Sequence, residues 1–345
     1  MARLLDAAAW APAKGFTAAI NGPGPRVEGG LISLALVIAP RGAESEGQRP
    51  LRRGFFLIRF PMIWSFCPDT DNFLEKRQGA LLAAESINCQ TWAAVSRTHS
   101  ASPGGPQHRF LTHDDGATAS AHAVVSAHLK TLLLSSMSEA QSEQLVAFLD
   151  QHRVDVESME GPREAALHFA ATWSQRSGRS FSVEMNQALY ELRQVTMPEA
   201  EGGQLLLAAP AHAERLSEFV TGFLRECFPS NTTTPEQIAK RVARLIDQKK
   251  GYFWCDRDGS LVSMAAIVRE SPNTTSISLV YTPPKQRGRG HAARVVAALS
   301  QAQLESGKIA CNLHTDLDNP TSNGVYIRLG YDVIQHRVQV RLVSP

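Results

Sequence analysis

The sequence lacks the features that mark several large protein classes. Its five cysteines form no C-x-x-C pair and no Cys/His cluster at zinc spacing, which excludes a disulfide scaffold and a zinc module. Its longest apolar run, 31–39, is far shorter than the roughly 20 residues that a membrane-spanning helix needs. Lysine and arginine total 35 against 33 aspartate and glutamate, so no charge excess attracts nucleic acid or an anionic membrane. We therefore expect a cytoplasmic protein with free cysteines, no metal, and neither nucleic acid nor membrane as a partner.

The chain is long enough for two domains. It has 345 residues, 43% of them hydrophobic and 20% charged, which is typical of a globular protein with domains of about 100–200 residues. Residues 1–61 contain eight glycines and six prolines without a sustained period. We expect a disordered or non-native-like leader there, with a targeting or partner-binding arm as the alternative. An acidic, glycine-ended linker at 197–203 then separates a domain at 62–196 from another at 204–345.

Apolar periodicity predicts alternating helices and strands in the first domain. One helix carries Phe73 and Leu81 on its apolar face, and a later helix begins at the N-cap Ser138. Pro162 stands at the first position of another. The expected helices after the first cover 138–152 and 162–176, and the expected strands cover 91–95, 109–112, 121–127, 129–134, 154–158 and 181–192.

The second domain repeats this alternation with more strands. Helices are expected at 211–227, at 235–249 with Thr234 as the cap, at 290–306 and at 321–329. Strands are expected at 204–208, 252–255, 261–269, 275–282, 309–314, 332–335 and 338–343. This order describes a mixed sheet with helices packed on it, which is an α+β architecture.

The sharpest motif lies between a strand and a helix, at 279–292, where the sequence reads LVYTPPKQRGRGHA. Two prolines end the strand, and small residues lead directly into the helix. The first helical N–H groups have no internal partners, and Gly288 and Gly290 have no Cβ to block close approach, so the turn suits an anion such as a pyrophosphate. Arg287 and Arg289 add positive charge. The motif completes neither a Rossmann fingerprint nor a nucleoside triphosphate loop, and taken alone it could be a simple tight turn.

Two motifs together resemble the GNAT superfamily of acyl-CoA-dependent N-acyltransferases. The pattern [QR]-x-x-G-x-[GA] is matched by 287–292, after a strand and at the start of a helix. The pattern N-x-x-[SA]-x-x-x-Y…G-[FY] is matched by 319–326 together with Gly330 and Tyr331. The resemblance covers about 204–343. It implies a three-layer α/β fold with a mixed, mostly antiparallel GNAT-type sheet flanked by helices.

The resemblance implies a role for each matched residue. Leu279, Val280 and Tyr281 would hydrogen-bond the pantetheine arm of acetyl-CoA, and Asn319 would also contact this arm. The pyrophosphate would be held by the backbone amides of Arg287, Gly288, Arg289, Gly290, His291 and Ala292. In the family the amine attacks the thioester directly, which requires an N–H donor at the developing oxyanion and an acid for the departing thiolate. The backbone N–H near Val280 is our candidate donor, and Tyr326 is our candidate acid.

Simpler explanations exist for several of these residues. Tyr326 could be a core tyrosine, and Asn319 could serve only as a helix cap. His291 is expected to be a solvated side chain in the first turn of its helix. Glu270 is the second catalytic candidate, as a base, but surface solvation or a water chain are equally good accounts. The same holds for the two other acids that could reach a substrate cleft, Glu226 and Asp316.

The first domain resembles the same superfamily more loosely, as a degenerate tandem copy. Where a cofactor loop would link 129–134 to 138–152, the sequence reads SSMSE, with no glycine, no arginine and an acid at Glu139. Charge repulsion and the lost close approach argue against CoA binding there. We therefore expect the second domain to be the catalytic one and the first to be structural or substrate-shaping.

These features predict an N-acetyltransferase, an acyltransferase that takes acetyl-CoA as its cosubstrate and acetylates a primary amine in a ternary complex. The alternatives are a catalytically silent acyl-CoA-binding sensor and an interaction module built on the GNAT fold. The acceptor is expected to be a small-molecule or peptide amine. The sequence leaves its identity open, and it leaves open whether the protein is a monomer or a homodimer.

Overall fold

The computed structural model describes residues 64–101, 108–114, 121–126, 129–199, 202–228 and 232–343, together with the backbone of short strands before residue 64. The chain divides into two compact units, one of 1–64 with 113–120 and one of 65–112 with 121–345. The strands of the first unit pair as β1 (Phe16–Ala18) with β4 (Ile38–Pro40), and as β3 (Leu31–Leu36) with β2 (Val27–Glu28) and β5 (Phe56–Pro61). The rest of 1–61, and with it the predicted leader, lies outside the described residues.

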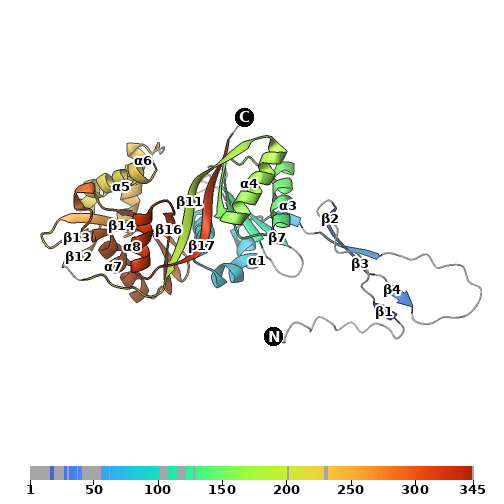
Figure 1. The fold of residues 1–345 in the computed structure, drawn as a ribbon, viewed down its shortest axis with the longest axis horizontal. Coiled ribbons are helices and arrows are strands. Elements are labelled where there is room, and N and C mark those ends of the chain that lie inside the picture. Colours follow the sequence, from blue (N-terminus) through green and yellow to red (C-terminus); the bar gives the residue numbers. More distant parts are fainter. Residues whose placement is uncertain are drawn as a thin grey trace, which may run out of the picture. The chain divides into compact units, whose positions relative to one another are not determined.

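One mixed sheet runs through the second unit (Figure 1). Its order is β12-β13-β14-β15-β16-β11-β17-β10-β9-β8-β7, with β6 (Ile63–Phe66) beyond β7. These strands are β7 (His108–Asp114), β8 (Ala121–Ser126), β9 (Thr131–Leu134), β10 (Ser158–Pro162), β11 (Ser180–Leu192), β12 (Gln204–Leu207), β13 (Gly251–Cys255), β14 (Leu261–Glu270), β15 (Thr274–Tyr281), β16 (Ala310–Asp316) and β17 (Asp332–Val343). The pairs β9/β10 and β15/β16 are parallel, and the other pairs described are antiparallel. The predicted mixed, mostly antiparallel sheet is therefore confirmed.

Helices flank this sheet on both faces. They are α1 (Thr70–Ala83), α2 (Cys89–His99), α3 (Glu139–Gln151), α4 (Arg163–Ser177), α5 (Ala213–Cys227), α6 (Pro235–Asp247), α7 (His291–Glu305) and α8 (Pro320–Arg328), with short 3₁₀ turns at η1 (Pro210–His212) and η2 (Pro284–Gln286). The predicted N-caps are confirmed, because Ser138 and Thr234 each form a capping box with a glutamine three residues later. No helix in the described residues is long and apolar enough to cross a membrane.

Two apolar clusters fix which helices cover which face near β14 and β15. Met264 and Ala266 of β14 pack with the residues of α5 and α6. Their neighbours Ala265 and Ile267 pack instead with the residues of α7. Because successive side chains of a strand point to opposite faces, α5 and α6 cover one face and α7 covers the other.

The last strand of each half lies inside the sheet of the other half. β11 pairs antiparallel with both β16 and β17, and β17 also pairs antiparallel with β10. Figure 1 shows β11 and β17 running side by side between the two halves. The second half therefore obtains one of its central strands from the first half, and the first half obtains one from the second.

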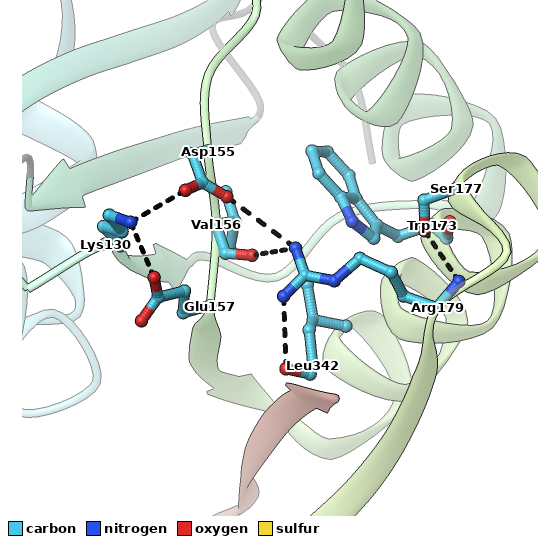
Figure 2. A network of polar contacts seen from close by, with 8 residues as sticks. All are labelled: Lys130, Asp155, Val156, Glu157, Trp173, Ser177, Arg179 and Leu342. Atoms are coloured by element: carbon cyan, nitrogen blue, oxygen red, sulfur yellow. Dashed lines mark hydrogen bonds and ion pairs between the residues drawn. The ribbon is translucent and has the colours of Figure 1, made fainter. Parts of the chain in front are cut away.

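A polar network holds the end of β17 in the first half (Figure 2). The guanidinium of Arg179 donates through Nη2 to the carbonyl of Leu342 at 3.3 Å and through Nη1 to the carbonyl of Val156 at 3.2 Å. The same Nη1 lies 3.7 Å from the carboxylate of Asp155, which also pairs with Lys130 at 2.9 Å. Surface ion pairs contribute about 1 kcal/mol or less each, so this network mainly fixes the position of the strand end.

Two predicted strands of the first half differ in the structure. Residues 91–95 form no strand, because they belong to α2, whose residues from Cys89 to Val95 are all buried. A short apolar run that is buried all round has no period that distinguishes helix from strand. The strand predicted at 154–158 begins only at Ser158 and runs to Pro162, where Pro162 is the N-cap of α4 and not its first residue.

The two closing strands predicted at 332–335 and 338–343 are one continuous strand, β17. Arg337, which lies between the two predicted strands, continues the strand and is buried. Its guanidinium donates through Nη2 to Gln90 at 2.7 Å and through Nη1 to Gln335 at 2.7 Å. Hydrogen-bond partners from a distant part of the chain thus allow a charged side chain in the middle of a buried strand.

Candidate functional site

A bulge distorts the end of β15. The ladder with β14 shifts register between the pairs Ala266/Ser278 and Met264/Tyr281. Between these pairs Leu279 has a φ of 54°, in the left-handed region that a bulky side chain rarely adopts. A backbone outlier of this kind costs about 1–3 kcal/mol and is commonly found at functional sites.

β15 also separates from β16 at this end. The two strands pair in parallel only over Thr274–Ser276 and Ala310–Asn312. Beyond Ser276 no described residue of β16 pairs with β15, although β16 continues to Asp316 alongside β11. Backbone polar groups need hydrogen-bond partners, so the segment from 277 to 281 offers its free edge to an extended ligand. This segment contains all three residues predicted to bind the pantetheine arm.

The turn after β15 leads into a helix whose first amides are uncapped. Gly288 has a φ of 75° and Gly290 a φ of 76°, both in the region that favours glycine. Gly290 is the N-cap of α7, and it provides no side-chain cap for the first amides of this helix. These N–H groups and the positive end of the helix dipole suit a phosphate group, as the motif predicts.

Arg287 connects this turn with the end of α5. Its Nε donates to the carbonyl of Thr282 at 2.9 Å, and its Nη2 lies 2.6 Å from the carboxylate of Glu226. The hydroxyl of Tyr281 donates to the same carboxylate at 3.1 Å. Burial, and then Glu226, raise the pKa of Tyr281. Glu226, one of the three acids named as possible bases, is therefore part of the framework of the turn.

His291 lies in the protein interior and not in solvent, which corrects the prediction for this residue. Only 4% of its surface is exposed, and its Nδ1 lies 3.4 Å from Nη1 of Arg294. The same Nη1 donates to the carbonyl of Arg289 at 2.7 Å. Arg294, in the first turn of α7, thus hydrogen-bonds the backbone of the glycine-containing loop that precedes the helix. A sequence pattern does not reveal this contact.

Tyr326 is buried in the core next to the open edge. Its ring lies 6.2 Å from that of Tyr190 and 6.0 Å from that of Tyr331. Burial raises the pKa of Tyr326 far above its usual value, with smaller contributions from Cys227 and Tyr190. The hydroxyl therefore keeps its proton throughout the neutral range. The core role considered for this tyrosine is confirmed, and that role is compatible with acid catalysis.

Cys227, at the end of α5, belongs to the same neighbourhood. Burial raises the pKa of its thiol, the carboxylates of Glu226 and Asp316 raise it further, and Arg287 lowers it. Charged residues of the turn, of the end of α5 and of the end of β16 therefore all lie near the thiol of Cys227. Tyr326 interacts with Cys227 from α8, so four elements far apart in the sequence meet beside the open edge of β15.

Asn319 caps α8 as expected. Its Oδ1 accepts a hydrogen bond from the amide of Ser322 at 3.1 Å. The neighbouring Asn323 donates through Nδ2 to the carbonyls of Asp316 and Asn319. The start of α8 is thus fixed to the end of β16, while the contact of Asn319 with a cofactor stays a prediction.

Glu270 lies away from the phosphate turn. It ends β14 opposite Thr275, at the end of β15 that is remote from Tyr281. Its carboxylate pairs with Nζ of Lys250 at 2.5 Å. Glu270 and Lys250 line a cavity of about 810 Å³ that also reaches Leu279. Glu270 and the bulge residue Leu279 therefore line the same cavity but do not contact each other directly.

Four arginines that the sequence analysis did not identify also line this cavity. Arg97 belongs to α2 in the first half, and Arg269 belongs to β14. Arg241 and Arg244 line it from α6. Their i, i+3 spacing places both on one helix face. This spacing is the local sequence signal from which a pair of neighbouring arginines could have been predicted.

His314 was also missed. It lies on β16, two residues beyond Asn312, whose Oδ1 accepts a hydrogen bond from Ser276 at 2.6 Å. Neither ring nitrogen of His314 has a hydrogen-bond partner among the described residues. Burial, and then Arg269 and Arg337, lower its pKa well below the usual value, so a neutral imidazole lies on the same strand face as Asn312, past the last residue that pairs with β15.

The corresponding region of the first half is built differently. The capping box at the start of α3 pairs the amide of Gln141 with the side chain of Ser138, and the amide of Ser138 with the side chain of Gln141. At the end of β9, a Cβ added to Gly161 of β10 would lie 2.8 Å from Cβ of Leu134, so the two strands stay in close contact there. The start of α3 therefore has a side-chain cap and no glycine turn before it, unlike the start of α7. No group of three or more potential metal ligands occurs among the described residues.

The comparisons with known proteins agree with this geometry. Residues 256–340 match the FR47-like protein family, and no curated protein matches the chain. A solved Drosophila protein is 13% identical with a TM-score of 0.56, covering 81% of this chain and 98% of its own. A GCN5-related N-acetyltransferase from Sphaerobacter thermophilus is 16% identical with a TM-score of 0.54 (82% and 96%). One from Kribbella flavida is 16% identical with a TM-score of 0.50 (76% and 96%). The chain has the GNAT acetyltransferase fold.

Proposed function

We propose that this protein is an N-acetyltransferase that uses acetyl-CoA to acetylate a primary amine. One observation carries the proposal: the free edge of β15 beyond Ser276 leads through the bulge at Leu279 into the uncapped start of α7. An extended arm that ends in a pyrophosphate needs this combination of an open strand edge and a helix N-terminus. The resemblance to the GNAT superfamily implies the same arrangement, with the strand edge binding the pantetheine arm and the helix N-terminus binding the pyrophosphate.

The chain's own residues suit each part of the cosubstrate. The backbone of Leu279, Val280 and Tyr281 would hydrogen-bond the pantetheine arm, and the amides of 288–292 would bind the pyrophosphate. Arg289 lies on the exposed turn and adds a positive charge that Glu226 does not neutralise. Bound acetyl-CoA would supply the activated acetyl group, and the protein would place it beside the bulge.

Catalysis would depend on two donors. The backbone N–H near Val280 would donate to the carbonyl oxygen as negative charge develops on it. Tyr326 would donate its proton to the departing sulfur, because burial keeps its hydroxyl protonated. Glu270 would accept the amine proton, directly or through water in the cavity that it lines. The amine would attack directly in a ternary complex, without an acyl-enzyme.

The second half would be the active one. Its turn has two left-handed glycines and an uncapped helix, whereas the first half has a capped helix and closely packed strands. The first half would act in structure and substrate binding, since it supplies β11 to the sheet and Arg97 to the cavity. A small-molecule or peptide amine is the proposed partner.

The test is a calorimetric titration of the full chain with acetyl-CoA, followed by an assay of thiol release with a panel of amines. We expect one binding site per chain and thiol release that depends on the amine. Binding without thiol release for any amine would identify an acyl-CoA sensor. Absence of binding would overturn the proposal and leave an interaction module built on this fold.

A further inference from the structure

The cavity beside Leu279 is strongly cationic. Five positive side chains line it, and Glu270 is its single carboxylate. The positive residues are Arg97, Arg241, Arg244, Lys250 and Arg269. The chain as a whole carries a formal charge of only +2, so this concentration of charge is a local property. A cleft lined by one sign of charge focuses the field on its interior.

The four arginines have no partners within the protein. Glu270 pairs with Lys250, and among the described residues no carboxylate or hydrogen-bond acceptor contacts the guanidinium of Arg97, Arg241, Arg244 or Arg269. The undescribed segments nearest in sequence to the cavity, 102–107 and 229–231, contain no acid. Nothing in these parts of the chain neutralises the cluster.

The four arginines are also close to one another, and two of them, Arg241 and Arg269, are half-buried. Burial lowers the pKa of Arg97, and Arg269 and Arg244 lower it further. Burial and then Arg244 lower the pKa of Arg241. Like charges that are held close together repel one another, and the folded chain itself gains nothing from this arrangement. Such a cost is commonly retained where a ligand supplies the opposite charge.

The cavity is placed to hold the acceptor. It lies on the α5/α6 face of the sheet, and its floor includes Ser278 and Leu279 at the bulge of β15. A ligand there would lie next to the strand segment proposed to hold the thioester. At about 810 Å³ the cavity has the size of a small-molecule site, which is typically about 300–1,000 Å³. Residues of α2 in the first half line one side of it.

We infer that the acceptor is a small amine that also carries an anionic group, either a carboxylate or a phosphate, and that Arg97, Arg241, Arg244 and Arg269 bind this group while the amine faces the bulge. The inference rests on the proposed function, because it names the substrate class of that same site. Planar guanidinium groups bind both anions through paired N–H donors. Glu270 lies in the same cavity and would attract the ammonium group of the acceptor as it enters.

The test compares pairs of amines in which one member carries an anionic group and the other is its neutral counterpart. Thiol release from acetyl-CoA is measured for the wild-type full chain with β-alanine against β-alaninamide, and with phosphoethanolamine against ethanolamine. We expect kcat/KM to be at least about tenfold higher for the anionic member of one or both pairs, since a hydrogen-bonded charge contributes about 1.5–3 kcal/mol. A preference for phosphoethanolamine or for β-alanine distinguishes phosphate from carboxylate. Equal or higher rates with the neutral members would overturn the inference.

A variant then connects the preference to the cavity. Arg241→Gln with Arg244→Gln should raise KM for the anionic amine about tenfold or more and leave KM for the neutral amine and the affinity for acetyl-CoA unchanged. Lys240→Gln, on the exposed face of the same helix, is the matched control and should leave all three values unchanged. Equal losses for both amines would contradict anion recognition by these arginines. If the double variant does not fold, the wild-type comparison still decides the question.

Failure of this inference is distinguishable from failure of the proposed function. Acetyl-CoA binding by calorimetry tests the β15 edge and the α7 turn without any acceptor. If acetyl-CoA binds and neutral amines are acetylated as well as anionic ones, the function stands and the substrate class is wrong. If acetyl-CoA does not bind, both are overturned.

Discussion

The guanidinium of Arg287 lies 2.6 Å from the carboxylate of Glu226, and this pair joins the turn before α7 to the end of α5. The carboxylate therefore lies beside the amides proposed to bind pyrophosphate. It holds the turn in place, but it also opposes the approach of an anion. The two effects have opposite signs and can be measured separately.

Replacing Glu226 with glutamine keeps a hydrogen-bond acceptor for Arg287 and removes the negative charge. We expect Glu226→Gln to bind acetyl-CoA about threefold more tightly at low ionic strength, because a partly exposed charge contributes about 1 kcal/mol or less. Calorimetry at low and high salt measures this, and the gain should disappear at high salt. Weaker binding at both salt concentrations would show that the carboxylate matters mainly for positioning.

Gly290 tests the phosphate turn directly. Valine at a φ of 76° is strained, and its Cβ would lie 3.3 Å from Nη2 of Arg294. We expect Gly290→Val to weaken acetyl-CoA binding at least about tenfold. Gly259, which has a φ of 83° in an open hairpin turn, gives the matched control Gly259→Val, with similar strain and unchanged affinity. An unaltered affinity in Gly290→Val would refute the phosphate-binding assignment.

Tyr326 tests the proposed acid. Tyr326→Phe removes the hydroxyl and retains the ring between Tyr190 and Tyr331. General acids contribute about 10²–10⁴-fold, so we expect kcat to fall about 100-fold with no change in acetyl-CoA affinity. Steady-state kinetics and calorimetry on the same variant measure both quantities. A normal kcat would remove Tyr326 as the acid.

Acid should destabilise the protein through its buried histidines. Burial, and to a smaller extent Arg77, lower the pKa of His122 to about 3, while the unfolded chain binds the proton near pH 6.5. The stability is therefore complete above about pH 6.5 and decreases as the pH falls towards 3, by up to about 1.4 kcal/mol per pH unit for each such histidine. His314, whose pKa is also lowered, acts in the same direction.

Urea unfolding at pH 7.5 and at pH 5.0 measures this effect. The loss on acidification should be smaller in His122→Gln, which keeps a polar group near Oγ1 of Thr91. His336 is exposed, so His336→Gln should lose as much stability as the wild type. Equal losses in all three proteins would show that His122 does not carry the pH dependence.

The exchange of strands between the halves predicts that the second half cannot be isolated at its apparent boundary. A fragment that starts at Gln204 lacks β11 and leaves the facing edges of β16 and β17 unpaired. We expect this fragment to aggregate, whereas one that starts at Gly178 and keeps β11 should retain more folded protein. Circular dichroism and gel filtration compare the two. A folded, monomeric fragment from Gln204 that binds acetyl-CoA would contradict this.

Several features were predictable because they depend on neighbours in sequence. The caps at Ser138 and Thr234 follow from side chains that reach amides three residues later. The turn at Gly288 and Gly290 follows from residue types that permit a positive φ. The alternation of apolar residues predicted most of the strands and helices. These short-range rules gave the α+β class and the candidate phosphate turn.

Other features depend on contacts between residues far apart, and no local pattern encodes them. The segment 91–95 is helical because α2 buries it against β14 and β15. His291 is interior because Arg294 and the core close over it. The bulge at Leu279 could not be read from a sequence that looks like a regular strand.

The sequence by itself determined the chemistry that is available: a strand, a glycine turn with two arginines, and a helix that begins without a cap. The tertiary structure decided where β11 and β17 pair, and it gathered Arg97 with Arg244 around one cavity. The physical reason is the distance along the chain over which the interactions act. Backbone conformation and capping depend on a few bonds along the chain, whereas strand partners, burial and the field inside a cavity depend on the whole packed fold.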